Sequence, residues 1–97
     1  MILKKEFVLS KQLLRSGTSV GANVHEASQG QSTNDFISKM SIALKEIAET
    51  EYWLVLLSRT GYIDEKQYQS IIFDCKEIAR ILTSIVKKSK NKVEETH

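Results

Sequence analysis

Residues 40–57 read MSIALKEIAETEYWLVLL, and their apolar positions recur with the period of an α-helix. Spacings of three, four and seven residues place one apolar stripe along a single face of that helix. Ser32 or Thr33 can cap its N-terminus, and Gly61 stands where a C-terminal glycine usually ends a helix. The pattern therefore predicts a helix over residues 34–59. Its stripe consists of Phe36, Met40, Ala43, Ile47, Leu54 and Leu57.

The same helix is apolar on a second side, opposite the main stripe. Ile42, Trp53 and Leu56 fall there when successive residues are rotated by about 100°. A helix with two apolar sides needs two partners, because either side would otherwise leave apolar surface in water. One partner is the chain's own bundle, and the other is either a further helix or another subunit.

Two further helices are predicted, one on each side of residues 34–59 in the sequence. Residues 65–88 follow Asp64 as the cap and carry an apolar heptad pattern, and the tail 89–97 is expected to fray. Residues 6–27 form the other helix. Three helices and short loops predict an all-α, antiparallel up-and-down helical bundle in one domain, residues 1–97. The stripes are Leu9, Leu13, Val20, Val24 and Ala27 in the first helix and Tyr68, Ile71, Ile72, Cys75, Ile78, Ala79, Leu82, Ile85 and Val86 in the last.

Residues 15–27, RSGTSVGANVHEA, resemble a phosphate-binding loop at first sight, because they combine glycines with small hydroxyl residues. A phosphate loop needs a preceding strand and a Gly-Lys-Ser/Thr ending, and the sequence has neither. The apolar period instead runs straight through Gly17 and Gly21, each of which costs a helix about 1 kcal/mol relative to alanine. We therefore interpret the two glycines as a seam where another helix backbone comes close.

The composition is that of a small globular protein. The 97 residues are 41% hydrophobic and 27% charged, and they include no proline, which favours long helices. The single Cys75 excludes an internal disulfide and is typical of a reducing compartment. Residues 1–12 lack the apolar core of a signal peptide, and no run is long enough to span a membrane. These features predict a cytoplasmic location.

Carboxylates crowd the middle helix and raise the question of catalysis. Glu46, Glu49 and Glu51 lie within six positions, and Glu26 is a candidate fourth carboxylate from the first helix. Such a group can bind a divalent metal or act as acid and base. However, the Glu-x-x-His pattern of di-metal bundles is absent. Ion pairs with Arg15, Lys39 or Lys45 are the favoured interpretation, so we predict no enzyme activity, no metal site and no cofactor.

The C-terminal part of the chain is basic. Five basic residues and no acidic residue occur between positions 80 and 92. They are candidates for contacts with nucleic-acid phosphates. The alternative is a solvated helix end whose lysines complement the helix dipole, since no aromatic residue is interleaved between positions 80 and 92. The candidates are Arg80, Lys87, Lys88, Lys90 and Lys92.

Several stretches together resemble the four-helix bundle family of the 23S rRNA intervening-sequence proteins. They are QLLRSGTSVGANVHEA at residues 12–27, STNDF at 32–36, residues 40–57, and GYI at 61–63. The resemblance implies a ring-like homo-oligomer, usually a pentamer, with no enzymatic activity, and a related branch binds nucleic acid. It also implies structural or interfacial roles for the recurring polar positions Arg15, Ser19, Asn23, Glu26, Glu46, Glu49 and Glu51.

The chain departs from that family at its N-terminal end. Family members normally carry a further helix of about 20 residues before the segment that begins here near Lys4, and here that helix is absent or reduced to residues 1–7, MILKKEF. Either the chain is shortened, or this member closes its core differently. We expect contacts between subunits to cover what that helix would cover. The departure bears on the number of subunits in the ring more than on the bundle itself.

Three functional hypotheses follow from these observations. The leading one is a non-catalytic oligomeric bundle associated with RNA or a ribonucleoprotein. The alternative is a scaffold or accessory subunit that binds a protein partner through the apolar side around Trp53. A metal-dependent enzyme that uses the clustered glutamates ranks third. No membrane partner and no small-molecule substrate are predicted.

Overall fold

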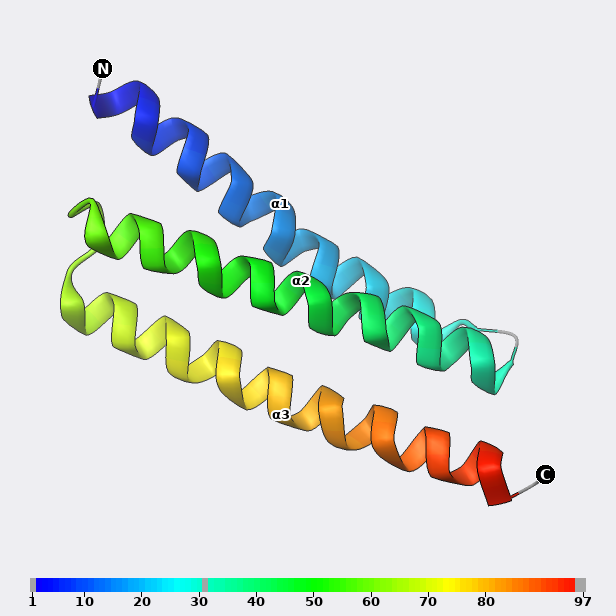
Figure 1. Cartoon of the computed structure of the whole chain (residues 1–97). Coiled ribbons are helices and arrows are strands. Elements are labelled where there is room, and N and C mark those ends of the chain that lie inside the picture. The colour runs from blue at the N-terminus through cyan, green and yellow to red at the C-terminus, as the bar shows by residue number, and fades with distance from the viewer. Residues whose placement is uncertain (1, 31, 96–97) are drawn as a thin grey trace.

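The computed structural model describes the backbone of residues 2–30 and 32–95 and the side chains of residues 8–30 and 32–93. Within these ranges the chain forms three α-helices: α1 (Ile2–Ser28), α2 (Thr33–Arg59) and α3 (Glu65–Glu95). Short connections reverse the chain between them, so that neighbouring helices are antiparallel (Figure 1). The predicted all-α, up-and-down helical bundle is confirmed.

The helix α2 is the shared partner of the other two. Both α1 and α3 pack along it, but they do not pack against each other in the described part of the chain. Figure 1 shows α2 between its neighbours, with the N-terminal half of α1 diverging from it. The resulting body is long and thin, 56 × 21 × 15 Å. Three helices therefore form an open layer in which one side of α1 and one side of α3 have no helical neighbour.

The ends of α2 are fixed by the capping residues that the sequence predicts. The Ser32 hydroxyl accepts a hydrogen bond from the backbone N–H of Asp35 at 3.1 Å, which makes Ser32 the N-cap. At the other end Gly61 has a φ of 82°, a left-handed conformation that favours glycine. The backbone N–H groups of Gly61 and Tyr62 bond the carbonyls of Ser58 and Leu57, which is the Schellman pattern.

The start of α3 is fixed by a reciprocal pair of hydrogen bonds. The Asp64 carboxylate accepts from the backbone N–H of Gln67 at 2.7 Å, and the Gln67 side chain accepts from the backbone N–H of Asp64 at 3.0 Å. This arrangement is a capping box, which satisfies two N–H groups that a helix start otherwise leaves unpaired. The prediction that Asp64 caps this helix is confirmed.

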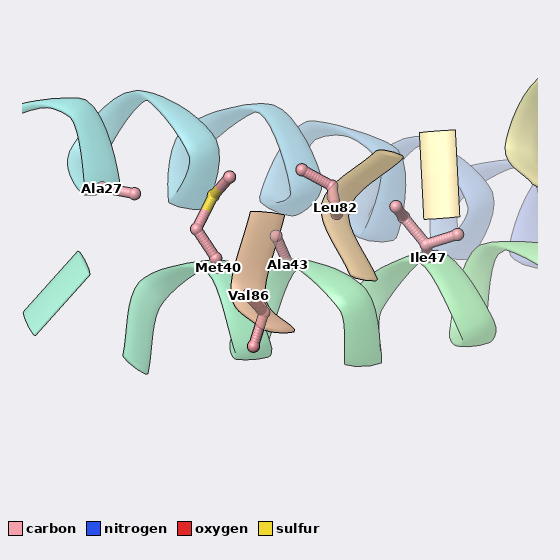
Figure 2. Packing of buried hydrophobic residues seen from close by; sticks show 6 residues of the cluster. All are labelled: Ala27, Met40, Ala43, Ile47, Leu82 and Val86. Atoms are coloured by element: carbon pink, nitrogen blue, oxygen red, sulfur yellow. The ribbon is translucent and has the colours of Figure 1, made fainter. Parts of the chain in front are cut away.

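The hydrophobic core lies where α1 and α3 both face α2. Ala43 and Leu54 are fully buried on α2. The cluster that contains Ala43 takes its side chains from all three helices (Figure 2). Each buried aliphatic side chain contributes on the order of 1.5–3 kcal/mol relative to an exposed one. The cluster drawn in Figure 2 consists of Ala27, Met40, Ala43, Ile47, Leu82 and Val86.

Two predicted helix limits are wrong. α1 begins at Ile2 rather than at residue 6, because residues 2–5 continue the helix without a breaker. α3 continues to Glu95, so the tail predicted to fray from residue 89 is helical, and residues 96–97 lie outside the described residues. No glycine or proline interrupts residues 89–95, and good helix formers dominate there.

The predicted apolar stripe of α3 is only partly buried. Ile72, Leu82 and Val86 are buried, whereas Ile71 and Ile78 are 40% and 44% exposed. The stripe predicted by the sequence is wider than the surface that α2 alone can cover. Ile71 and Ile78 therefore point to the side of α3 on which the open layer has no fourth helix.

Candidate functional site

The predicted cations of α3 are exposed along its C-terminal half. Lys87, Lys88, Lys90 and Lys92 are exposed, and none forms an ion pair with a described residue. Because the helix turns by about 100° per residue, the four lysines point around the helix end in several directions. They form a cationic end of α3 rather than one flat patch.

Arg80 differs from the four lysines because it has an acidic partner. Its Nη2 lies 3.0 Å from Glu77 Oε2, one helical turn away. The Arg80 side chain is 71% exposed and the Glu77 side chain is 47% exposed, so solvent screens this pair and the guanidinium stays accessible. Arg80 and Lys87 are two turns apart on the same side of the helix.

The predicted carboxylates of α2 join a polar network between α1 and α2. The Arg15 guanidinium donates to Glu49 and to Gln12, and its Nη1 lies 3.9 Å from Glu46 Oε2. Glu49 Oε1 also accepts from the indole N–H of Trp53 at 3.2 Å. The carboxylates thus face a cation from the neighbouring helix, which agrees with the ion-pair interpretation and ties the two helices together.

Glu46 depends on Arg15 more than Glu49 does. Its side chain is only 18% exposed, and its Oε2 is buried without a hydrogen-bond partner among the described residues. An unpaired buried carboxylate oxygen is costly because water no longer solvates its charge. The Arg15 guanidinium is the opposite charge that offsets this cost.

Arg15→Ala is accordingly expected to lower the free energy of unfolding by about 1 kcal/mol, a value discounted for the half-exposed position of Arg15. Urea denaturation followed by circular dichroism measures this change. Lys45→Ala is the matched control, because Lys45 is an exposed α2 cation without an ion pair to a described residue, and it should shift stability by less than about 0.5 kcal/mol. Equal midpoints for Arg15→Ala and the wild type would contradict a stabilising role.

The other two candidate carboxylates are paired with lysines from different helices. Glu26 Oε2 lies 3.1 Å from Lys39 Nζ, which links α1 to α2, and Glu51 Oε1 lies 3.4 Å from Lys76 Nζ, which links α2 to α3. The sequence predicts Lys39 as a partner but does not predict Lys76. The position of Lys76 opposite Glu51 depends on how α3 packs along α2, which the sequence pattern does not show. No group of three or more His, Cys, Asp or Glu suited to a metal occurs in the described part of the chain.

Two other polar contacts of α1 differ in whether they cross to α2. The Thr50 hydroxyl lies 3.0 Å from the Ser16 hydroxyl, and both residues are buried between the helices. Asn23, for which the family resemblance implies a structural or interfacial role, donates to the backbone carbonyl of Ser19 in its own helix at 2.9 Å. Of these two contacts, the hydrogen bond between Ser16 and Thr50 is therefore the one that joins α1 to α2.

A groove of about 460 Å³ runs between α1 and α3, with α2 at its floor. Leu14 projects into solvent at its edge with 71% exposure, and Gly17 lies beside it. A Cβ added to Gly17 or Gly21 would meet no atom within 4 Å, so the close helix predicted for this seam is not in the described chain. The groove is lined by Ser10, Leu13, Leu14, Gly17, Thr18, Thr50 and Ile71.

The second apolar side of α2 is only partly open. Ile42 is 40% exposed, whereas Trp53 and Leu56 are half-buried. The Trp53 ring meets the exposed Tyr52 ring edge-on, with centroids 5.1 Å apart. Because Glu49 holds the Trp53 indole, this surface combines apolar and charged groups rather than forming a continuous apolar patch.

Cys75 is half-buried in the α3 stripe. Burial raises the pKa of its thiol, and the nearby Glu51 and Asp74 carboxylates raise it further. A raised pKa keeps the thiol protonated at neutral pH, which is the opposite of what a nucleophile needs. The interpretation as a packing residue is therefore favoured.

Two comparisons with known proteins give the same family. The family model described as 23S rRNA-intervening sequence protein matches residues 2–84. The chain is 63% identical to a protein of unknown function, from the S23 ribosomal protein family, of Bacteroides thetaiotaomicron VPI-5482. The match to that crystal structure has a TM-score of 0.83 and covers 87% of this chain and 78% of the other. A comparison with curated proteins gave no match.

None of the described helices is long and apolar enough to cross a membrane.

Proposed function

Because the chain belongs to the 23S rRNA-intervening sequence protein family, we propose that it is a non-catalytic helical-bundle protein that binds RNA. The observation that carries this proposal is the cationic end of α3. Lys87, Lys88, Lys90 and Lys92 are exposed without a described acidic partner, so each can exchange a condensed counterion of RNA for its own charge. The name of the family refers to 23S rRNA, and the Bacteroides relative is described as a member of the S23 ribosomal protein family.

The non-catalytic part of the proposal is supported by the carboxylates. Glu26, Glu46, Glu49 and Glu51 each lie within 4 Å of a lysine or arginine. Groups held in such pairs stabilise contacts between helices and are poorly placed to act as acid, base or metal ligand together. Cys75 is a free cysteine, which is consistent with a cytoplasmic site of action.

The test is a titration of the chain with structured RNA at low and moderate salt. Binding should weaken as salt rises, and changing all four lysines of the cationic end to alanine should lower the low-salt affinity at least about tenfold and flatten the salt dependence. The double variant Lys11→Ala/Lys45→Ala, which removes exposed lysines from α1 and α2, is the control and should bind nearly as the wild type does. Absence of binding at low salt, or unchanged binding after the four substitutions, would refute the proposal.

A second candidate function is self-association through the groove between α1 and α3. The specific observation is that Leu14 and Ile71 are exposed apolar side chains of this groove, and that Gly17 beside them leaves open space for another backbone. A helix of another subunit is the proposed occupant, and the resemblance to pentameric family members points to a ring. Association would also multiply weak RNA contacts through avidity. A solution mass that stays at one chain over a wide concentration range would contradict this candidate.

A further inference from the structure

An exposed aromatic residue stands in the middle of a basic line along α3. Lys66, Phe73, Arg80 and Lys87 follow one another at intervals of seven residues. Seven residues make nearly two helical turns, so the four side chains drift by only about 60° over the whole series and share one side of the helix. All four residues are exposed, and Phe73 is 66% exposed.

The surroundings of Phe73 on α3 are polar. Its neighbours one turn away on the same side are Gln69, Ser70, Lys76 and Glu77, and none is apolar. The core of a protein–protein interface is instead depleted in charge and continuous in apolar surface, as on the groove side of α3 with Ile71 and Ile78. An isolated aromatic ring between cations has a different physical use, because it offers a stacking face within reach of phosphate-binding groups.

The charge along α3 favours a polyanion. Helix α3 contains seven basic residues and five acidic ones; Glu94 and Glu95 end the helix beyond Lys87, and the other three acids lie within the span of the basic line. Two of these three acids are engaged, since Glu77 pairs with Arg80 and Glu65 accepts a hydrogen bond from Gln69. The third, Asp74, follows Phe73 directly and therefore points about 100° away around the helix.

From this juxtaposition we infer that the side of α3 formed by Lys66, Phe73, Arg80 and Lys87 binds single-stranded RNA, with an unpaired base stacked on Phe73. The inference rests on the proposed RNA binding and specifies the structural class of RNA. Lysines at the helix end attract phosphates of any RNA, whereas a flat ring contacts a base only where that base is not paired in a duplex.

The test compares three probes with the same number of phosphates: a single strand of mixed sequence, a duplex, and an abasic strand. Phe73→Ala should weaken binding of the single strand about tenfold and leave binding of the abasic strand and the duplex unchanged. Phe73→Trp should restore binding of the single strand. Ile81→Ala is the matched control, because Ile81 is a 52% exposed apolar residue of α3 outside the basic line, and it should bind as the wild type does.

Each outcome separates this inference from the proposed function. Equal affinity of Phe73→Ala and the wild type for the single strand would overturn the stacking role while salt-dependent binding persisted. A change in solution mass on Phe73→Ala would place the ring in a subunit contact and would also overturn it. No binding of any probe by the wild type at low salt would instead remove the proposed function and this inference with it.

Discussion

Leu54→Ala is expected to lower the free energy of unfolding by about 3 kcal/mol. Leu54 is fully buried on α2, the helix that both other helices use as their packing surface. Truncation removes the transfer free energy of three carbon atoms and leaves a cavity that long helices on either side close only in part. In a small domain this is a large fraction of the total stability.

The matched control for this substitution is Ile42→Ala on the same helix. Ile42 is 40% exposed, so its truncation removes a similar number of carbons from a site that is partly hydrated, and we expect a loss below about 1 kcal/mol. Urea unfolding of both variants should be measured at one protein concentration, because any association adds to apparent stability. Similar losses for the two variants would mean that another subunit buries Ile42 as fully as the chain buries Leu54.

The sequence pattern was sufficient to predict most of α2. Its apolar stripe, its Ser32 cap and its Gly61 ending are all determined by contacts within a few residues, and the structure confirms each of them. The capping of α3 by Asp64 is local in the same sense. Periodicity also predicted that the chain forms helices and in which order, because apolar residues that recur every three to four positions lie on one face only in an α-helix.

Tertiary packing determined what the pattern missed. The apolar repeat of α3 predicts a wide apolar face, but α2 covers only part of that face. Ile71 and Ile78 therefore stay exposed. The pairing of Glu51 with Lys76 depends on how α3 slides along α2, which no local signal encodes. The basic line through Phe73 has a heptad spacing, but an aromatic residue in a helix is usually buried, and only the packing of α3 against α2 leaves Phe73 exposed.

Gly17→Ala/Gly21→Ala is expected to raise the free energy of unfolding of the separated chain by about 2 kcal/mol. Both glycines lie inside α1, where alanine is favoured over glycine by about 1 kcal/mol at each position. The added methyl groups meet no atom within 4 Å, so no clash within the chain opposes this gain. Denaturation at the lowest protein concentration that gives a signal measures this gain in the free energy of unfolding. Ala22→Gly is the calibration, because Ala22 is an exposed residue of the same helix and its change to glycine should lower stability by the propensity difference alone.

The same double variant should weaken self-association. If a helix of another subunit approaches the seam, two methyl groups hold the backbones apart and remove packing contacts along the groove beside Leu14. The dissociation constant measured by sedimentation should therefore rise while the stability of the separated chain also rises. The double variant would then be more stable as a separated chain but weaker in self-association. This combination distinguishes the seam from an ordinary exposed surface, because glycines that contact no other subunit would give only the gain in stability that comes from the helix propensity of alanine. A stabilised double variant whose association is unchanged would show that the occupant of the groove, if any, does not contact Gly17 and Gly21.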